Sequence, residues 1–351
     1  MPASEWPFAV MPGERDTDVV CLGHALVDRL AYVEDGGVER IGLEPGIMVL
    51  VDGSRAFEIE RAVPAWQQVA GGSAANTAAG VASLGGSAAF IGAVGKDELG
   101  DWYSTDLEAA GVRCIVHPER SGRPTGVCHV LVTRGGTRSM ATHLGAASWV
   151  HSSAAEAAGL PDAAILYIEG YLLDAEAASA VDRALAIARG AGTLTALSLS
   201  DPFVVARHHG RISEMVFCGL FDILFGNEEE VLGLTGAADL TAAADALGRQ
   251  EMVSVITRGP QGSLAVLPGG TVEVPADDVD PVVDTTGAGD LFAAGCLYAI
   301  AAGHGPEHAL SVGAYAAGEI ISHMGARPEV NLRDAAPAEL VSSARSRLRG
   351  A

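Results

Sequence analysis

Residues 281–303 read PVVDTTGAGDLFAAGCLYAIAAG, and this stretch decides how the chain folds. Residues 281–283 indicate the end of a short strand, and residues 285–289 predict a tight turn with two closely spaced glycines. From Asp290 onward, apolar residues recur at helical spacing until Gly303 stops the pattern. The sequence therefore predicts a helix that begins directly at a glycine-rich turn.

A glycine-rich turn at the start of a helix is suited to bind an anion. The first backbone N–H groups of a helix have no acceptor within the helix, and the positive end of the helix dipole points outward there. Glycines also let a phosphate approach the backbone without meeting a Cβ atom. The turn therefore predicts a phosphate site.

Asp290 lies beside this predicted phosphate site, where a negative charge weakens phosphate binding. A carboxylate at this position makes sense if it takes the proton from a hydroxyl that attacks phosphorus. The alternative is that Asp290 only caps the helix, as aspartates often do. For an isolated Gly-x-Gly-Asp motif the capping role is the better interpretation, so the catalytic interpretation needs support from the rest of the chain.

The composition indicates a large globular α/β protein. The chain has 351 residues, of which 49% are hydrophobic, and this length buries enough surface to need no disulfide or metal for its fold. No internal repeat and no linker typical of a domain boundary occurs. We expect a flexible N-terminus over residues 1–16 and a single domain over residues 17–351.

The net charge of −22 argues against nucleic acid and anionic membranes as partners, and it leaves a polyanionic substrate to local amides, a few cations and a metal ion. The five cysteines are scattered and form no C-x-x-C pair, which favours a reducing compartment. The first residues lack the basic end and apolar run of a signal peptide, and no stretch is long and apolar enough to span a bilayer. We expect a cytoplasmic protein that is a monomer or a homodimer.

Strands and helices alternate along most of the chain, which predicts a mainly parallel sheet with helices on both faces. Polar residues that follow such strands gather at one edge of the sheet. We expect the strands at residues 18–23, 89–95, 165–168, 194–199, 222–225 and 254–257, and the polar residues are Asp28, Glu169, Asp201, Asn227, Thr257 and Asp290. A solvated loop position is an equally good interpretation of Asp28 by itself.

Two segments indicate structure outside the main sheet. Residues 30–63 carry few helix signals and contain a strand at 47–51, and residues 124–144 predict a hairpin with strands at 126–133 and 138–143. Arg138 points either at substrate or at water. We also expect helices from residue 73 to 84, over 96–111, over 174–189 and over 306–323.

Three separated motifs resemble, in order, the signatures of the ribokinase-like family of carbohydrate and nucleoside kinases, also called the phosphofructokinase-B type. They are GGSAAN at residues 71–76, N-x-x-E at residues 227–230 and DTTGAGD at residues 284–290. The resemblance extends from about residue 18 to about residue 344. It implies a three-layer α/β sandwich with a mainly parallel central sheet and a small β-sheet lid, formed here by residues 30–63 and 124–144.

The resemblance also implies roles for individual residues. Asp290 would be the catalytic base, and the amides of Gly287, Ala288 and Gly289 would form the anion hole. ATP with Mg²⁺ would be bound by Asn227, Glu230, Thr257, Gly259 and His323, with Glu230 acting on Mg²⁺ through water. The substrate ligands would be Asp28, Gly72, Asn76, Arg138 and Glu169, and Asp284 with Thr286 matches a loop that often binds a monovalent cation such as K⁺.

The substrate is less closely defined than the reaction. Ser73 stands where ribokinases proper tend to carry a lysine, and residues 23–28, 169–171 and 321–328 look more like bacterial adenosine kinases. We therefore expect adenosine as the acceptor and a role in purine salvage. The alternatives are a sugar kinase of the fructose or 2-keto-3-deoxygluconate type and a non-catalytic sensor on the same fold. A dinucleotide-dependent enzyme is disfavoured because no G-x-G-x-x-G motif follows the first strand.

Overall fold

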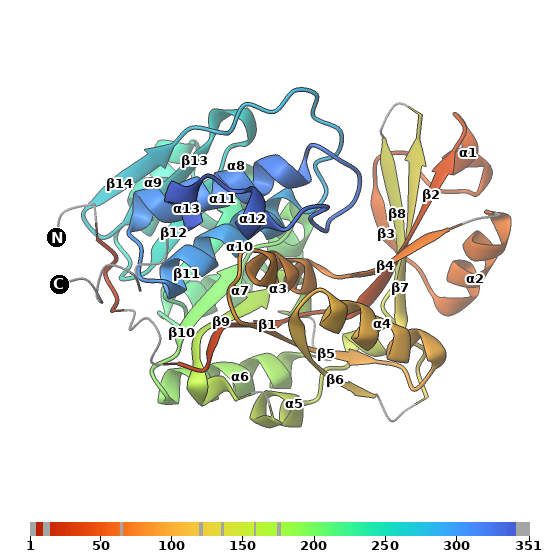
Figure 1. The fold of residues 1–351 in the computed structure, drawn as a ribbon, viewed down its shortest axis with the longest axis horizontal. Helices are drawn as coiled ribbons and strands as arrows, with labels where there is room; N and C mark the ends of the chain where they lie inside the picture. The colour runs from red at the N-terminus through yellow and green to blue at the C-terminus, as the bar shows by residue number, and fades with distance from the viewer. Residues whose placement is uncertain are drawn as a thin grey trace.

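A computed structural model describes residues 5–9, 15–63, 66–118, 122–134, 137–157, 159–173 and 177–341. They form an α/β body built on a nine-stranded sheet, with a five-stranded sheet beside it (Figure 1). The order of the large sheet is β14-β13-β12-β11-β10-β9-β1-β5-β6. Its strands are β1 (Thr17–Leu22), β5 (Ala88–Val94), β6 (Val112–Pro118), β9 (Ala163–Glu169), β10 (Leu194–Ser198), β11 (Ile223–Asn227), β12 (Val253–Thr257), β13 (Ser263–Leu267) and β14 (Gly270–Val274).

The predicted parallel sheet is confirmed. All neighbouring strands from β6 to β12 pair in parallel, and only β13 and β14 add an antiparallel edge. Polar side chains that follow the parallel strands therefore meet at one edge, as the alternation of elements predicts. The sequence interpretation missed β6, β13 and β14.

Helices cover both faces of the large sheet, which gives the expected three layers (Figure 1). Helices of one face pack around α10 and α11, and those of the other face around α6 and α7. The first face carries α3 (Ser73–Ser83), α4 (Glu98–Ala109), α10 (Ala288–Ala301) and α11 (Pro306–Ile320). The second carries α5 (Ser152–Ala157), α6 (Ala178–Gly190), α7 (Pro202–Phe217), α8 (Glu228–Thr235) and α9 (Leu240–Leu247), and α12 (Leu332–Ala335) and α13 (Ala338–Val341) follow α11.

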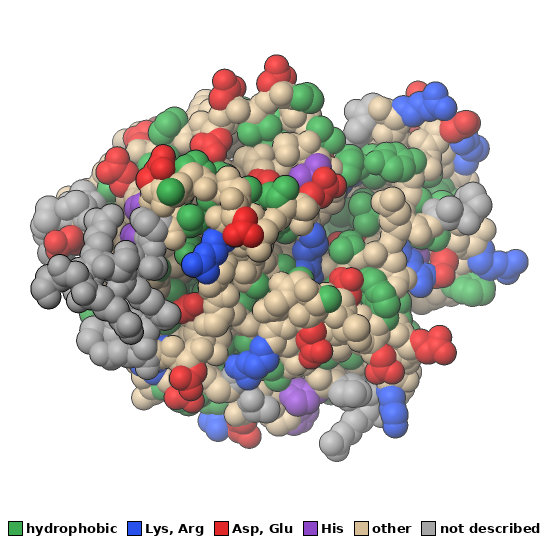
Figure 2. Space-filling model, viewed as in Figure 1, with side chains coloured by type: hydrophobic (Ala, Val, Ile, Leu, Met, Phe, Trp, Pro, Cys, Tyr) green, Lys and Arg blue, Asp and Glu red, His purple; other side chains and the backbone are tan. Residues whose placement is uncertain are grey.

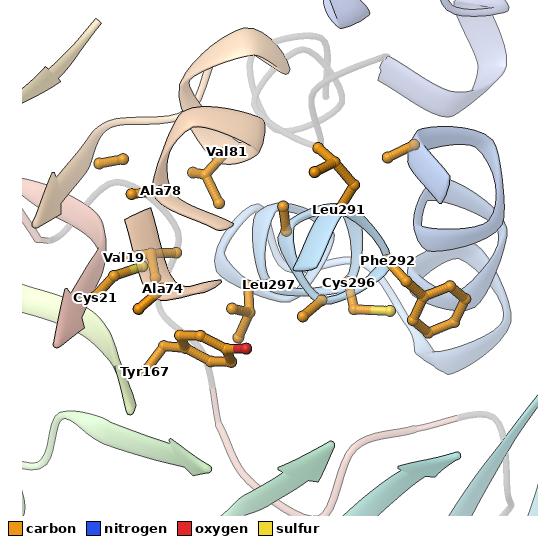
Figure 3. Close-up of a cluster of buried hydrophobic side chains, with 14 of the residues drawn as sticks. Val19, Cys21, Ala74, Ala78, Val81, Tyr167, Leu291, Phe292, Cys296 and Leu297 are labelled. Atoms are coloured by element: carbon orange, nitrogen blue, oxygen red, sulfur yellow. The ribbon is translucent and has the colours of Figure 1, made fainter. Parts of the chain in front are cut away.

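Small residues bring α3 and α10 into close contact, and these two helices carry the motifs noted above. Figure 3 shows Ala74, Ala78 and Val81 of α3 facing Leu291 and Leu297 of α10. A Cβ atom on Gly80 of α3 would lie 2.6 Å from the Ala294 side chain of α10. The alanine-rich composition of α3 is therefore a packing requirement that holds the GGSAAN motif beside the DTTGAGD turn.

The smaller sheet is the predicted lid, and its strand order is β3-β8-β7-β2-β4. Its strands are β2 (Leu26–Val33), β3 (Met48–Leu50), β4 (Gln67–Gly71), β7 (Gly126–Thr133) and β8 (Arg138–His143). Two helices, α1 (Gly37–Arg40) and α2 (Gly53–Ala62), lie in the segment between β2 and β4. The predicted hairpin and the predicted strand near residue 48 are confirmed, whereas β2, β4 and α2 were missed.

One further expectation needs correction, and the expected flexible N-terminus stays a prediction. Residues 281–283 form no strand, because Val282 is 53% exposed and the Val283 amide donates to the Ile321 carbonyl at the end of α11. Of the expected flexible N-terminus, residues 1–4 and 10–14 lie outside the described part. Within residues 5–9, the Trp6 indole donates to the His304 carbonyl at 2.7 Å, so this piece is held against the body.

Candidate active site

The DTTGAGD turn leads directly into α10 at the edge where the parallel strands end. Gly287 caps the helix with φ at 77°, and a Cβ there would lie 2.9 Å from the Ala326 side chain. A Cβ on Gly289 would meet nothing within 4 Å. Gly287 is therefore required by the backbone and by packing, whereas Gly289 leaves open space next to the helix N-terminus.

The Ala288 amide differs from its neighbours. It donates to the Thr285 carbonyl at 3.2 Å, whereas the Gly287 and Gly289 amides have no hydrogen bond to the described residues. The expectation that all three amides form an anion hole is therefore narrowed to Gly287 and Gly289, since Ala288 is already used to close the turn.

Asp290 lies in the first turn of α10 and is held by two side chains of α3. The Ser73 hydroxyl donates to Oδ1 at 2.7 Å, and the Asn76 Nδ2 group donates to Oδ2 at 3.0 Å. Burial raises the pKa of Asp290 to about 6, against the effect of these two donors and of the Arg327 charge. The carboxylate does not cap its own helix, so the capping interpretation is wrong.

Both the oxygen and the nitrogen of the Asn76 side-chain amide form hydrogen bonds within the protein. Its Oδ1 accepts from Arg327 Nε at 3.1 Å, while Nδ2 donates to Asp290. The side chain is 5% exposed, and it lines the same cavity as Asp290. One hydrogen of Nδ2 remains for a substrate, because a primary amide has two donors.

One cavity of about 420 Å³ lies between the lid and the body, and we call it the acceptor cavity. Its polar end contains Asp28, Asn76 and Asp290. Apolar side chains also line it, with Met48, Leu50 and Met140 from the lid and Tyr171, Phe203 and Val204 from the body, and the polar side chains of Asp201, Arg207 and His208 come from the same part of the body as Phe203. The sequence interpretation missed Tyr171 and Phe203, because a 3-10 turn after β9 and a helix N-terminus place them there.

The structure places Asp28 in strand β2 of the lid, which corrects the expectation of a loop residue after the first strand. Strand β2 pairs with β4, so Asp28 lies opposite Val69 and next to Gly71. Burial raises the pKa of Asp28 to about 7, and Arg327 and Arg138 oppose that rise.

A second cavity of about 610 Å³ opens on the other side of the turn, and we call it the donor cavity. Thr257 and Gly259 line it, as expected, together with small residues of α11. Thr257 and Gly289 line both the donor and the acceptor cavity. The two cavities therefore meet at the N-terminus of α10, where a group can pass from one ligand to the other.

His323 is not one of the residues that line the donor cavity, and its expected contact with nucleotide stays a prediction. Its Nε2 lies 3.2 Å from a Glu319 oxygen, and its Nδ1 lies 3.2 Å from the Met324 carbonyl oxygen. Both ring nitrogens therefore have partners at the end of α11 and in the loop that follows it.

Asn227 and Glu230 form a capping box at the start of α8. The Glu230 amide donates to Asn227 Oδ1 at 2.9 Å, and the Asn227 amide donates to Glu230 Oε2 at 2.9 Å. Burial raises the pKa of Glu230 to about 7. Both residues line the acceptor cavity and a small cavity of about 90 Å³ beside Asp290 and Gly289.

Two expected substrate ligands are engaged by other groups of the protein, although Glu169 also lines the acceptor cavity. Glu169 is 1% exposed and accepts the amides of His24 and Ala74, each at 2.8 Å, so it holds the start of α3. Arg138 of β8 forms an ion pair with Asp284 at the beginning of the turn. The remaining expected ligand, Gly72, lines the acceptor cavity as the residue before α3.

Hydrogen-bond donors already occupy both carboxylate oxygens of Asp284, which leaves few lone pairs for a monovalent cation. Oδ1 accepts the Thr286 amide at 3.0 Å, and Oδ2 accepts the Gly325 amide at 2.8 Å as well as the Arg138 guanidinium. A positive charge therefore already faces this carboxylate. The surroundings of Asp284 therefore do not fit the K⁺ site that the resemblance suggested.

The molecule outside the cavities offers few other candidates. In the part of the chain that the structure describes, no three His, Cys, Asp or Glu side chains gather as a metal site, and none of the helices could span a membrane. On the face that Figure 2 shows, basic side chains are interspersed with acidic ones and form no continuous patch.

Comparisons with known proteins agree with this geometry. The family model described as pfkB family carbohydrate kinase matches residues 16–332. The chain is 28% identical over 334 residues to adenosine kinase from Saccharomyces cerevisiae, covering 88% of this chain and 95% of the yeast protein. Among solved structures, a probable sugar kinase from Rhizobium etli has a TM-score of 0.87 at 35% identity, over 93% of this chain and 99% of that one. Adenosine kinase from Sinorhizobium meliloti has a TM-score of 0.85 at 37% identity, over 92% and 98%.

Proposed function

The chain belongs to the pfkB family of carbohydrate kinases and transfers phosphate from ATP to a hydroxyl group, and from this premise we propose that its acceptor is the 5′-hydroxyl of adenosine. One observation carries the proposal. The acceptor cavity brings the polar groups of Asp28, Asn76 and Asp290 together with aromatic and methionine side chains, Tyr171, Phe203, Met48 and Met140. A ribose with a purine attached offers hydroxyls to the first set and a flat ring to the second.

The polar end suits the ribose. We propose that Asp28 accepts hydrogen bonds from the vicinal 2′ and 3′ hydroxyls and that the second hydrogen of Asn76 Nδ2 supports them. The Gly72 backbone lines the same end of the cavity. Hydroxyl donors favour the ionised form of a carboxyl group, so the bound ribose lowers the pKa of Asp28 from its value of about 7.

The apolar end suits the purine. Phe203 is 53% exposed at the start of α7, where Asp201 caps the helix by accepting the Phe203 amide at 2.7 Å. Tyr171 lies on the same wall, and Met48 and Met140 lie opposite on the lid. Flat aromatic walls and flexible methionines are suited to hold a planar base.

Asp290 is proposed as the base that accepts the proton of the attacking hydroxyl. Its pKa of about 6 means that the carboxylate is ionised near neutral pH and still basic enough to take part in proton transfer. We propose that the Gly287 and Gly289 amides stabilise the charge on the transferring phosphoryl group.

ATP is proposed to fill the donor cavity, with its phosphates directed at the turn. Ala314, Ala317 and Gly318 of α11 leave room for the base, and Gly259 has open space at its Cβ position. Glu230 fits Mg²⁺ as a partner through water, because its carboxyl group lines the small cavity beside Gly289. Mg²⁺ bound there would neutralise the triphosphate charge, which the acidic chain cannot do alone.

The test compares kcat/KM for adenosine, inosine, guanosine, ribose, fructose and 2-keto-3-deoxygluconate with ATP and Mg²⁺. We expect adenosine to be preferred, and Phe203→Ala to raise its KM about tenfold, within the loss typical of an aromatic stacking partner. Phe217→Ala, at the opposite end of α7 and 40% exposed, is the matched control and should leave KM unchanged. A free sugar that exceeds adenosine by more than about tenfold in kcat/KM would overturn the nucleoside proposal.

A sugar acid is the second candidate because a cation lines the acceptor cavity. Arg207 of α7 lies there, with its guanidinium 5.8 Å from the Phe203 ring centroid. A guanidinium in this position can pair with the carboxylate of a keto-deoxy sugar acid. If 2-keto-3-deoxygluconate is the preferred acceptor, Arg207→Ala should remove that preference while leaving turnover of neutral sugars unchanged.

A further inference from the structure

One tripeptide in the loop after α11 contacts three parts of the candidate site. The Gly325 amide donates to Asp284 Oδ2 at 2.8 Å. Ala326 packs where a Cβ on Gly287 would fall, and Arg327 donates to the Asn76 side chain. The loop therefore contacts the start of the turn, the helix cap and, through Asn76, the proposed base.

Arg327 determines which way the Asn76 amide points. A guanidinium can only donate hydrogen bonds, so the Arg327 Nε group, 3.1 Å from Asn76 Oδ1, requires the amide oxygen on its own side. The Nδ2 group is then directed at Asp290 Oδ2, 3.0 Å away. With the amide reversed, its oxygen would face the Asp290 carboxylate and repel it.

We propose that Arg327 is a positioning residue for the phosphoryl-transfer reaction, acting on Asp290 through the Asn76 amide. This inference rests on the proposed role of Asp290 as the base. Arg327 does not line either the donor or the acceptor cavity, so it acts from behind the site.

The bonding of Arg327 distinguishes this role from a simple ion pair. Its Nη2 group donates to the Ala70 carbonyl at 2.5 Å and its Nε group to an amide oxygen, so neither of these bonds goes to a carboxylate. A partly buried guanidinium bound to two neutral oxygens is costly in stability. The arrangement makes sense if the charge and its direction serve the neighbouring site.

The charge of Arg327 acts on several groups around it. Asp28 of β2, Tyr103 and Asp106 of α4 and Asp290 of α10 all face it. The Arg327 charge lowers the pKa of Asp290, on which the Ser73 and Asn76 donors also act, and the Asp290 carboxylate in turn acts on Glu169, Tyr167 and Cys21. Loss of the positive charge should therefore raise the pKa of Asp290.

The experiment measures kcat and the KM values for acceptor and for ATP against pH for wild type, Arg327→Gln and Arg327→Lys, with the other substrate saturating in each case and Mg²⁺ in excess. Arg327→Gln should lower kcat about tenfold or more, since small misplacements of a reacting group cost up to about a hundredfold. Its acid limb should move to higher pH by about one unit, with KM for ATP unchanged. Arg327→Lys keeps the positive charge but cannot reproduce the hydrogen bond from Nε. Its kcat should therefore fall, while the pH of the acid limb should stay the same as in wild type.

A double-mutant cycle tests whether the effect passes through Asn76. Arg327→Gln should reduce kcat much less in an Asn76→Ala background than in wild type, because the residue that it orients is already gone. Arg211→Gln is the matched control, since Arg211 also bridges a carbonyl and a side-chain oxygen, at Leu173 and Asp182. It should leave kcat and the acid limb unchanged.

Full additivity of the two substitutions, or an unshifted acid limb in folded Arg327→Gln, would overturn the inference. If Arg327→Gln does not fold, the same double-mutant cycle is measured with Arg327→Lys, and full additivity there would overturn the inference. The proposed function fails separately: if Asp290→Asn keeps near-normal kcat, the base is wrong. If Asp290→Asn is inactive and Arg327→Gln is normal, only the positioning role is wrong.

Discussion

The two walls of the acceptor cavity are attached to the protein in different ways. On the body wall, Asp290 is held by Ser73 and Asn76 of α3, and α3 packs tightly on α10 through Gly80. On the lid wall, Asp28, Met48 and Met140 come from strands of a separate sheet. Contacts of that sheet with the body include the Arg138–Asp284 ion pair and the packing of Met324 against the buried cluster of Cys128, Val130 and Val132.

From this difference we infer that the body wall holds the catalytic groups and that the lid wall contributes to substrate selection. Groups that transfer protons must be held in place by packed elements, and the body wall meets this requirement. The lid wall belongs to the separate sheet and contributes the proposed ligands for the ribose hydroxyls and for adenine. Substitutions at Asp290 and at the residues that hold it should therefore lower kcat, and substitutions of the lid residues that line the cavity should mainly raise KM for the acceptor.

The largest effect is expected for Asp290→Asn on the body wall. The amide has the size of the carboxylate but cannot accept the proton, so kcat should fall by at least about a hundredfold, with ATP binding retained. The measurement is steady-state turnover together with titration of nucleotide binding. An Asp290→Asn enzyme with near-normal kcat would show that the body wall does not carry the base.

The same residue sets the pH dependence of wild type. A base must be deprotonated, and burial raises the pKa of Asp290 to about 6. The kcat of wild type should therefore be constant above this pH and fall as pH drops through it. A limb near pH 4, the usual range of aspartate, would contradict the burial of this carboxylate in the working enzyme.

The next largest effect separates two glycines of the same turn. Gly289→Val places a side chain in the open space where the cavities meet, so kcat should fall about 10²–10³-fold, as for loss of an oxyanion donor. Gly287→Ala places a Cβ against Ala326 at a φ of 77°, so it should mainly lower the melting temperature. The measurements are kcat and the melting temperature of both variants. A stable, fully active Gly289→Val would show that the turn serves only to cap the helix.

The sequence predicted the body wall well because its signals are local. Seven consecutive residues, 284–290, specify the turn, the cap and Asp290, and the Asn227–Glu230 spacing that suggested a motif also forms a capping box. The large sheet followed from strand and helix alternation. Its two edges were missed: β6 at one edge, and β13 and β14 at the other, which follow β12 without an α-helix between them.

The lid wall and the supporting residues were harder to predict because their contacts are distant in the sequence. Strand β2 exists through pairing with β4 and β7, which lie about 40 and 100 residues away, so Asp28 looked like a loop residue. Arg327 contacts Asn76 at a sequence separation of 251 residues, and no local sequence pattern near Arg327 indicates that contact. Phe203 reaches the cavity only because α7 begins at the sheet edge.

On the lid wall, Asp28→Asn should change binding more than turnover. Hydrogen bonds to a charged group are worth about 1.5–3 kcal/mol, so kcat/KM for adenosine should fall about ten- to a hundredfold, mostly through KM. Burial raises the pKa of Asp28 to about 7, and the ionised form binds hydroxyls better, so KM of wild type should rise as pH falls through this range. A loss confined to kcat would place Asp28 with the body wall.

The smallest effect is expected at Arg138, which joins the two walls. Arg138→Gln removes the lid charge from Asp284, but Asp284 keeps the amides of Thr286 and Gly325 as donors. The turn should therefore stay folded, and kcat should fall only about three- to tenfold, the size of one hydrogen bond in free energy. The measurement is kcat with and without K⁺ at constant ionic strength.

The response to K⁺ sharpens the comparison of the two walls. In wild type the Arg138 guanidinium faces Asp284, whose side chain is 2% exposed, so added K⁺ should have little effect. In Arg138→Gln the carboxylate lacks its positive partner, and K⁺ should restore part of the lost kcat while Na⁺ or Li⁺ restores less. Strong K⁺ activation of wild type would mean that the ion pair opens during turnover. The lid would then be held to the turn by the cation rather than by Arg138.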